Sequence, residues 1–188
     1  MYSLWEIPPP RVVKGVEGPE HRIYGCAYGH RGAIWLGSEP SNGGGGKYMN
    51  LNVGGDRNVV LAGSIVAYED YSLTEGLEGF RFGVTVKDLR TGRTLHHEPT
   101  GKRKVCGECE LEFGFGHTTA IVVNEGGEVA WIVEVPVDEG GGYQVHAVDS
   151  AGSRVLDSGP EINPSSLALG GSTLYWMHGA QADTAALH

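Results

Sequence analysis

The sequence predicts an all-β chain, and three observations support this prediction. Apolar residues alternate with polar ones in many short runs, and no long stretch shows apolar residues at the spacing of a helix face. The chain has 31 glycines among 188 residues, and many of them stand where a turn is expected between two such runs. A pattern of strand, turn and strand also recurs along the chain.

The recurring pattern has two halves. In the first half, a strand, a turn and a second strand end in an aromatic residue, which is Tyr68, Trp131 or Trp176. In the second half, two strands flank a turn that contains glycine. Copies of the second half occupy residues 84–95, 143–156 and, in degenerate form, 23–36. Four short antiparallel strands that repeat roughly every 45 to 60 residues predict a β-propeller of four-stranded blades, with a β-sandwich as the alternative.

The phase of the repeats predicts about three blades per chain. Two complete blades lie between residues 59 and 156. The N-terminal strands supply half of a further blade and the C-terminal strands the other half, so we expect one composite blade built from both ends. Closed rings have about four to eight blades. We therefore expect either a homodimer that closes a ring of six blades or a piece of a longer propeller. A dimer would also cover open blade edges, which otherwise favour aggregation.

The first part of the chain divides into an arm and the beginning of the repeats. Residues 1–20 form an arm rich in Pro and Gly, which either docks on the main body or stays disordered, and the predicted propeller spans residues 21–188. We expect strands at 23–28 and 33–36, followed by a polar loop over 38–58.

The complete repeats and the C-terminal half repeat predict the remaining strands. Glycines such as Gly63 and Gly92 supply the positive φ of the tight turns between them. The expected strands are 59–61, 64–68, 80–89, 93–97, an edge strand over 111–115, 120–123, 128–133, 143–149, 154–156, 167–169, 172–176 and 181–187.

Charge and composition exclude several classes of function. The formal net charge is −9 and basic residues form no large patch, which argues against nucleic acid as a partner. No apolar run approaches the length of about 18 residues that a membrane span requires. The sequence has no P-loop, no G-x-S-x-G, no H-E-x-x-H and no EF-hand loop, so it indicates no cofactor and no catalytic residue.

The compartment stays open at this stage. The start of the chain lacks the charged and apolar regions of a signal peptide, which favours the cytoplasm. A chain derived from an exported protein would instead be extracytoplasmic.

Cys106 and Cys109 form the sharpest local motif, a C-x-x-C pair. A disulfide that pins the loop between two blades is one interpretation. A metal site is the second, with Cys26 or a histidine completing the ligands. Thioredoxin-like chemistry is the third, although no βαβ unit surrounds the motif. Cys26 lies on a predicted strand and is best explained as a small, buried hydrophobic residue.

Four residues are candidates for ligand binding. His117 precedes the inner strand of a blade, the edge that borders a propeller's channel. His146 lies in the middle of a strand, on the face opposite its apolar neighbours. Tyr68 and Asp70 belong to an acidic aromatic stretch that either contacts a cation or sugar or forms a solvated loop.

Asp88 and Asp149 stand at equivalent places before the turns of the two complete repeats. We expect both side chains to cap backbone amides of those turns. Their repetition favours this structural role over a catalytic pair, because a catalytic residue is normally unique.

The segments 61–68, 88–93 and 145–149 carry a family resemblance. Their sequences LAGSIVAY, DLRTGR and VHAVD resemble the repeats of TolB-like and PD40-like β-propellers, and most of all those of uncharacterised bacterial propellers of actinobacterial type. The likeness covers roughly residues 22–187. It implies the fold and no activity. It also implies export, which favours disulfides, and more blades than this chain provides.

These observations favour a non-catalytic propeller module that binds a partner or ligand or assembles with itself. The alternative is a hydrolase or lyase acting on glycans or esters, with its site in the central channel. Propeller enzymes gather catalytic residues from separate blades, so the absence of a local motif leaves that alternative open.

Overall fold

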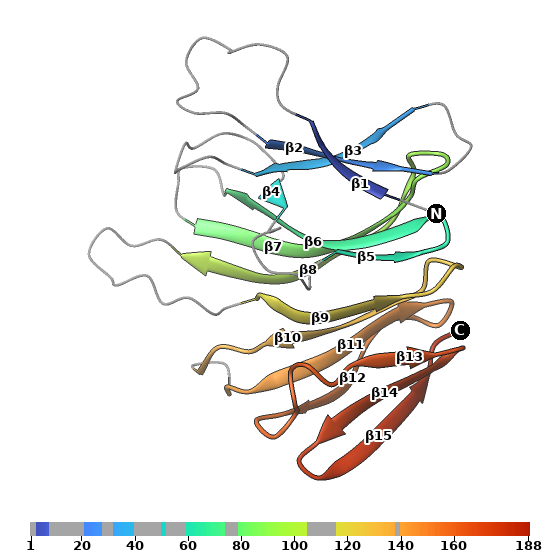
Figure 1. Cartoon of the computed structure of the whole chain (residues 1–188). Coiled ribbons are helices and arrows are strands. Elements are labelled where there is room, and N and C mark those ends of the chain that lie inside the picture. The colour runs from blue at the N-terminus through green and yellow to red at the C-terminus, as the bar shows by residue number, and fades with distance from the viewer. Residues whose placement is uncertain are drawn as a thin grey trace.

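The chain folds into four stacked layers of β-strands (Figure 1). The computed structural model describes residues 3–7, 21–27, 32–39, 50–51, 59–73, 79–104, 116–137 and 140–188. All named elements in these ranges are strands, which confirms the predicted all-β class. Within the same ranges, no helix is long and apolar enough to cross a membrane.

The N-terminal layer is an antiparallel sheet of β1 (Ser3–Ile7), β2 (His21–Cys26) and β3 (Ile34–Glu39). Strand β1 belongs to the predicted arm, and it pairs with β2 along its whole length. The short β4 (Asn50–Leu51) pairs with β3 and with β6 of the next layer, so these two layers form one continuous sheet.

The second and third layers are the two complete repeats, and each is a four-stranded antiparallel sheet in sequence order, as predicted. The second layer consists of β5 (Val59–Ala62), β6 (Ile65–Leu73), β7 (Gly79–Asp88) and β8 (Thr94–Lys104). The third consists of β9 (Thr118–Val123), β10 (Val129–Glu134), β11 (Tyr143–Asp149) and β12 (Gly152–Gly159).

The C-terminal layer has three strands, β13 (Ala168–Gly170), β14 (Thr173–His178) and β15 (Gln181–Ala186). This layer corrects the prediction of a composite blade, because among the described strands neither it nor the N-terminal layer takes a strand from the other end of the chain. Each end layer instead has a third strand of its own, β1 or β15. The described strands therefore form four layers, where the sequence predicted about three blades.

Apolar side chains fill the space between each pair of neighbouring layers. Alternate residues of a strand point to opposite faces, and β6 uses both faces: Ile65 and Ala67 face the third layer, whereas Val66 and Tyr68 face the N-terminal layer. Strand β10 does the same, with Trp131 in the cluster shared with the second layer and Ile132 in the cluster shared with the C-terminal layer. Three buried clusters therefore join the four layers in a row.

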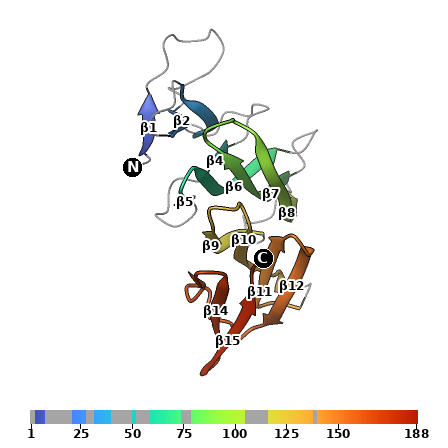
Figure 2. The same ribbon diagram turned by 90° about the vertical axis from the view of Figure 1, so that its right-hand side faces the viewer.

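The first strands of the second, third and C-terminal layers, which are β5, β9 and β13, lie together along one edge of the stack. Contacts join β5 to β9 and β9 to β13, and Figure 2 shows β5 and β9 toward one side with β8 and β12 toward the opposite side. Among the described residues no sheet closes on itself, and the N-terminal and C-terminal layers lie at opposite ends of the stack. The result is an open row of layers with a common inner edge.

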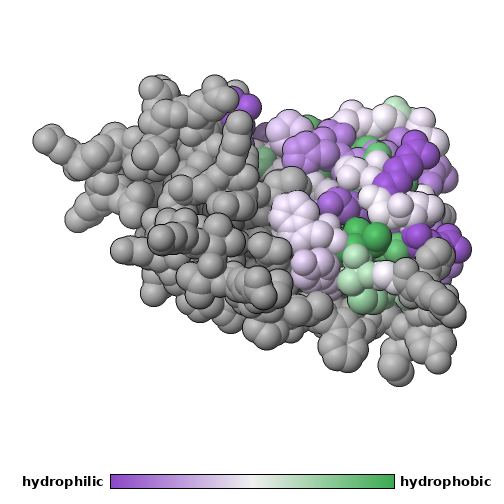
Figure 3. All heavy atoms as spheres, turned by 90° about the horizontal axis from the view of Figure 1, so that it is seen from above, coloured by the Kyte–Doolittle hydropathy of each residue, from purple (hydrophilic) through white to green (hydrophobic). Residues whose placement is uncertain are grey.

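Each end layer leaves part of its outward side uncovered. Trp35 of β3 is 41% exposed and Tyr175 of β14 is 44% exposed, although their neighbours Leu36 and Trp176 are buried against the adjacent layers. Figure 3 looks onto the N-terminal end and shows a small group of apolar side chains at the surface of the described part.

The turn aspartates have the predicted role. Asp88 accepts a hydrogen bond from the backbone N–H of Arg90, and Asp149 accepts one from that of Ala151, both at 2.9 Å. Asp149 does more than its counterpart. It forms a paired contact with the Arg154 guanidinium at 2.5 and 2.7 Å and accepts the backbone N–H of His188 at 3.1 Å. It therefore ties the end of the chain to the third layer.

Replacing Asp149 by Ala should lower the free energy of unfolding by about 3 kcal/mol, because it leaves the Arg154 charge unpaired and releases His188. Asp88→Ala is the matched control, which removes the equivalent turn contacts at a more exposed site and should cost about 1 kcal/mol. Urea denaturation at pH 7 measures both, and equal losses would contradict the anchoring role.

Asp149→Ala should also make the free energy of unfolding depend less on pH in the acid range. Arg154 lowers the pKa of Asp149 in the folded chain. The resulting stabilisation is present above the unfolded value of about 4 and is lost as the pH falls below it.

Candidate functional site

Tyr68 and Asp70 lie in β6 rather than in a solvated loop, and both are buried. The loop interpretation of this acidic stretch is therefore wrong, because β6 continues through it and the layers on both sides cover it. The Tyr68 hydroxyl donates a hydrogen bond to the Leu36 carbonyl at 3.2 Å. Burial, together with the nearby charge of Asp70, raises the pKa of Tyr68 well above its usual range. Its phenol thus links the N-terminal and second layers.

Asp70 is the buried end of a short polar chain within the second layer. The Thr85 hydroxyl donates to the Asp70 carboxylate and accepts from Nδ1 of His97 at 2.8 Å. His97 Nδ1 lies 3.6 Å from Asp70, and the histidine side chain is 57% exposed. The Asp70 carboxylate raises the pKa of His97. A proton taken up by His97 from solvent is therefore stabilised by a buried carboxylate.

Glu69, the neighbour of Asp70, points to the other face of β6 and reaches the third layer. It is fully buried, and it accepts the backbone N–H of Thr118 at 2.6 Å and contacts Nδ1 of His117 at 3.1 Å. The His117 ring also packs against Phe82, with ring centroids 4.6 Å apart. His117 does precede the inner strand β9, as expected, and its contacts with Glu69 and Phe82 join the second and third layers at that edge.

His146 lies inside the third layer. Its ring stacks on Trp131, with centroids 5.3 Å apart and planes 12° from parallel, and Nε2 contacts Gln144 at 3.0 Å. Burial lowers the pKa of His146. As predicted, its side chain lies on the face opposite Val145 and Ala147, which belong to the cluster under the C-terminal layer.

The four predicted ligand residues therefore do not form one site. Tyr68 and Asp70 share a strand face, and His117 and His146 occupy separate positions in the cluster between the second and third layers. A shallow, open cavity of about 340 Å³ lies along the inner strand β9, where its described lining is Thr119, Ala120, Ile121 and Ser165. These residues offer hydroxyls and apolar surface to a ligand.

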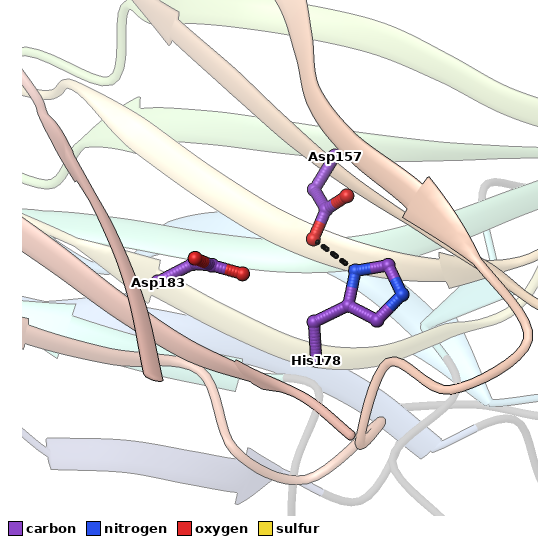
Figure 4. Close-up of side chains that lie close together, drawn as sticks. All are labelled: Asp157, His178 and Asp183. Carbon is purple, nitrogen blue, oxygen red and sulfur yellow. Dashed lines mark hydrogen bonds and ion pairs between the residues drawn. The ribbon is translucent and has the colours of Figure 1, made fainter. Parts of the chain in front are cut away.

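A second group of polar side chains lies between the third and C-terminal layers. Asp157 comes from β12, His178 from the end of β14 and Asp183 from β15 (Figure 4). One ligand atom from each of the three lies within 4.8 Å of the other two. Asp157 Oδ2 contacts Nδ1 of His178 at 2.9 Å and accepts the indole N–H of Trp176 at 2.7 Å. All three residues are half-buried.

Only part of this group follows from the sequence pattern. Asp183 pairs with Trp176 across the β14–β15 hairpin, so it lies on the same sheet face as His178, two residues along. Predicting the pairing of the two C-terminal strands from the sequence would therefore have placed His178 and Asp183 close together. Asp157 comes from another layer, and only the packing of layers brings it there.

The predicted cysteine pair lies outside the described residues, since Cys106 and Cys109 fall in the range 105–115. Cys26 is a free thiol in β2 and is half-buried.

Comparisons with known proteins give no relative: no protein-family model matches the chain, and neither a curated protein nor a solved structure is significantly similar to it. Function must therefore be argued from the chain's own residues.

Glu69→Ala should destabilise the chain by about 2–4 kcal/mol, because the Thr118 N–H and the His117 ring lose a buried partner. Glu69→Gln is the control, since the amide oxygen can still accept the Thr118 N–H, and it should cost less. The free energy of unfolding by urea at pH 7 measures both variants. If Ala and Gln cost the same small amount, the link between layers is unimportant for stability.

His97 and His146 should affect stability with opposite dependence on pH. The raised pKa of His97 adds stability when it is protonated, so His97→Gln should destabilise more at pH 5 than at pH 8. The lowered pKa of His146 means that the unfolded chain takes up its proton first, so His146→Gln should destabilise less at pH 5 than at pH 8. Denaturant midpoints at the two pH values measure this crossing, and parallel changes would contradict it.

Proposed function

We propose that this chain is a non-catalytic β-propeller module that completes a ring by assembling with a second copy of itself. The observation that carries the proposal is the contrast between inner and outer layers. The second and third layers bury apolar residues on both faces, whereas the C-terminal layer buries only the face that carries Leu174 and Trp176. Among the described residues, no further sheet covers the outward face of the C-terminal layer.

The outward face of the C-terminal layer has the chemistry of a packing surface. Strand register places eight residues on it, and none of them is charged: Ala168, Gly170, Thr173, Tyr175, Met177, Ala182, Thr184 and Ala186. A solvated sheet face normally carries charged side chains, and small residues allow a second sheet to approach to about 10 Å. This face thus resembles the packed faces of the inner layers more than a water-facing surface.

The other end of the stack offers an aromatic counterpart. In the N-terminal layer the strand register aligns Tyr24 with Trp35 across β2 and β3, and Trp35 is exposed. Aromatic side chains supply large contact areas at protein interfaces. We propose that the N-terminal layer of each copy packs on the C-terminal layer of the other.

The number of layers supports this arrangement. Two chains of four layers make eight, which is within the usual range of about four to eight blades for a closed propeller. The sequence predicted six blades in a dimer because it predicted three blades per chain. With four layers per chain, a dimer would have eight. A two-fold pairing of this kind covers both open ends at once.

Thr184→Arg should convert the dimer to a monomer, because it places a charge at the centre of the uncharged face of β15. Ser153→Arg is the matched control, since Ser153 is exposed on β12 and lies outside that face, and it should leave the dimer intact. Sedimentation velocity of both variants measures the association. A Thr184→Arg protein that stays dimeric would contradict the proposed contact.

A further inference from the structure

We propose that Asp157, His178 and Asp183 form a binding site for one zinc ion between the third and C-terminal layers. This inference is independent of the proposed self-assembly, because the three residues lie between the third and C-terminal layers and not on the outward face that would contact a second copy. One imidazole nitrogen and two carboxylate oxygens are donors that Zn²⁺ accepts in proteins.

The distances between the ligand atoms fit a zinc ion that would replace the hydrogen bond between Asp157 and His178. With bonds of about 2.0–2.2 Å, two ligand atoms of a tetrahedral zinc lie roughly 3.4 Å apart. Asp157 Oδ2 and His178 Nδ1 are already 2.9 Å apart, so they need to separate only slightly. A carboxylate oxygen of Asp183 lies within 4.8 Å of a ligand atom of each of these two residues, and Figure 4 shows the Asp183 carboxylate directed toward them from the neighbouring strand. A small rotation of that side chain closes the set.

Two neighbouring groups hold the ligands in place. The Trp176 indole donates to Asp157 Oδ2 at 2.7 Å, which orients the carboxylate as outer partners of metal ligands do. The His178 ring lies against Gly159, where a Cβ would come within 3.0 Å of Cε1 and Nε2. The missing side chain at Gly159 thus leaves room for the imidazole edge that points away from the carboxylates.

The donor set also indicates which ions are excluded. Ca²⁺ requires six to eight oxygen ligands, and Mg²⁺ keeps an octahedral shell of oxygens, so neither suits a site centred on an imidazole. The three protein ligands leave one position of a tetrahedral ion for water. The half-buried position gives the ion access from solution.

Binding would fasten the last two layers together. Asp157 belongs to β12, while His178 and Asp183 belong to the hairpin of β14 and β15. An ion bound to all three in the folded chain and not in the unfolded chain raises the melting temperature as the zinc concentration rises.

The test is calorimetric titration of the metal-free full chain with ZnCl₂ at pH 7.5, alongside Asp183→Asn and Asp157→Asn. These substitutions keep side-chain size and remove a charged ligand. The unmodified chain should bind one zinc per chain, and each variant should bind at least tenfold more weakly. CaCl₂ should give no comparable binding.

His97→Gln is the matched control, because His97 also faces an aspartate but that pair has no third ligand in the described contacts. It should leave the zinc affinity unchanged. Circular dichroism checks that the variants are folded, and a zinc-dependent rise in melting temperature, absent in Asp183→Asn, gives a second readout.

Three results would overturn the proposal. The first is no stoichiometric zinc binding by the unmodified chain. The second is unchanged affinity in both aspartate variants, and loss of binding in Cys106→Ser would then place the ion on the cysteines. The third is binding of Ca²⁺ as tight as that of Zn²⁺.

Discussion

Burial of both faces of each inner sheet is the constraint on which the rest of the structure depends. A sheet that is covered on both faces needs consecutive apolar residues in its central strands, and Ile65–Tyr68 of β6 and Val129–Val133 of β10 form such runs. Ile65 and Val66 are adjacent in sequence yet belong to different clusters, so each strand joins two neighbouring layers. Such a chain cannot bury its layers separately, because each layer provides half of the core of the next.

Polar side chains between the layers fix the position of each sheet relative to its neighbour. Apolar contacts tolerate small shifts of one sheet over another, whereas a buried carboxylate with fixed donors does not. Glu69 fixes β6 against the start of β9, and Asp149 fixes the end of the chain against β11 and β12. Asp157 contacts Trp176 and His178 of the last layer in the same way. An acidic residue therefore lies at the edge of the interface between the second and third layers and at the edge of the interface between the third and C-terminal layers.

The sequence predicted most strands and their turns, because these depend on local patterns. Gly63 and Gly92 do adopt positive φ of 57° and 74°, and the turn aspartates cap the amides expected of them. The sequence predicts strand β8 only over 93–97, yet β8 continues to Lys104. Pro99 stands beside a register shift in this edge strand, where the missing N–H is tolerated.

The polar sites were less predictable, because burial and contacts between layers are not local properties. Glu69 and Asp70 look like a solvated acidic pair until the layers on both sides of β6 are known. The partners of Asp157 lie about twenty residues away on another sheet. The predicted number of blades also differs from the four layers found. The sequence pattern did not show that β1 pairs with β2, or that β15 completes a separate C-terminal layer with β13 and β14.

The central claim is that an open row of four layers is completed by a second copy of the chain. The molar mass of the unmodified protein in solution, measured by light scattering behind a sizing column, tests it most directly. The account predicts a stable particle of twice the 20.0 kDa of one chain across the eluted concentrations. A particle of 20.0 kDa at all concentrations would contradict it.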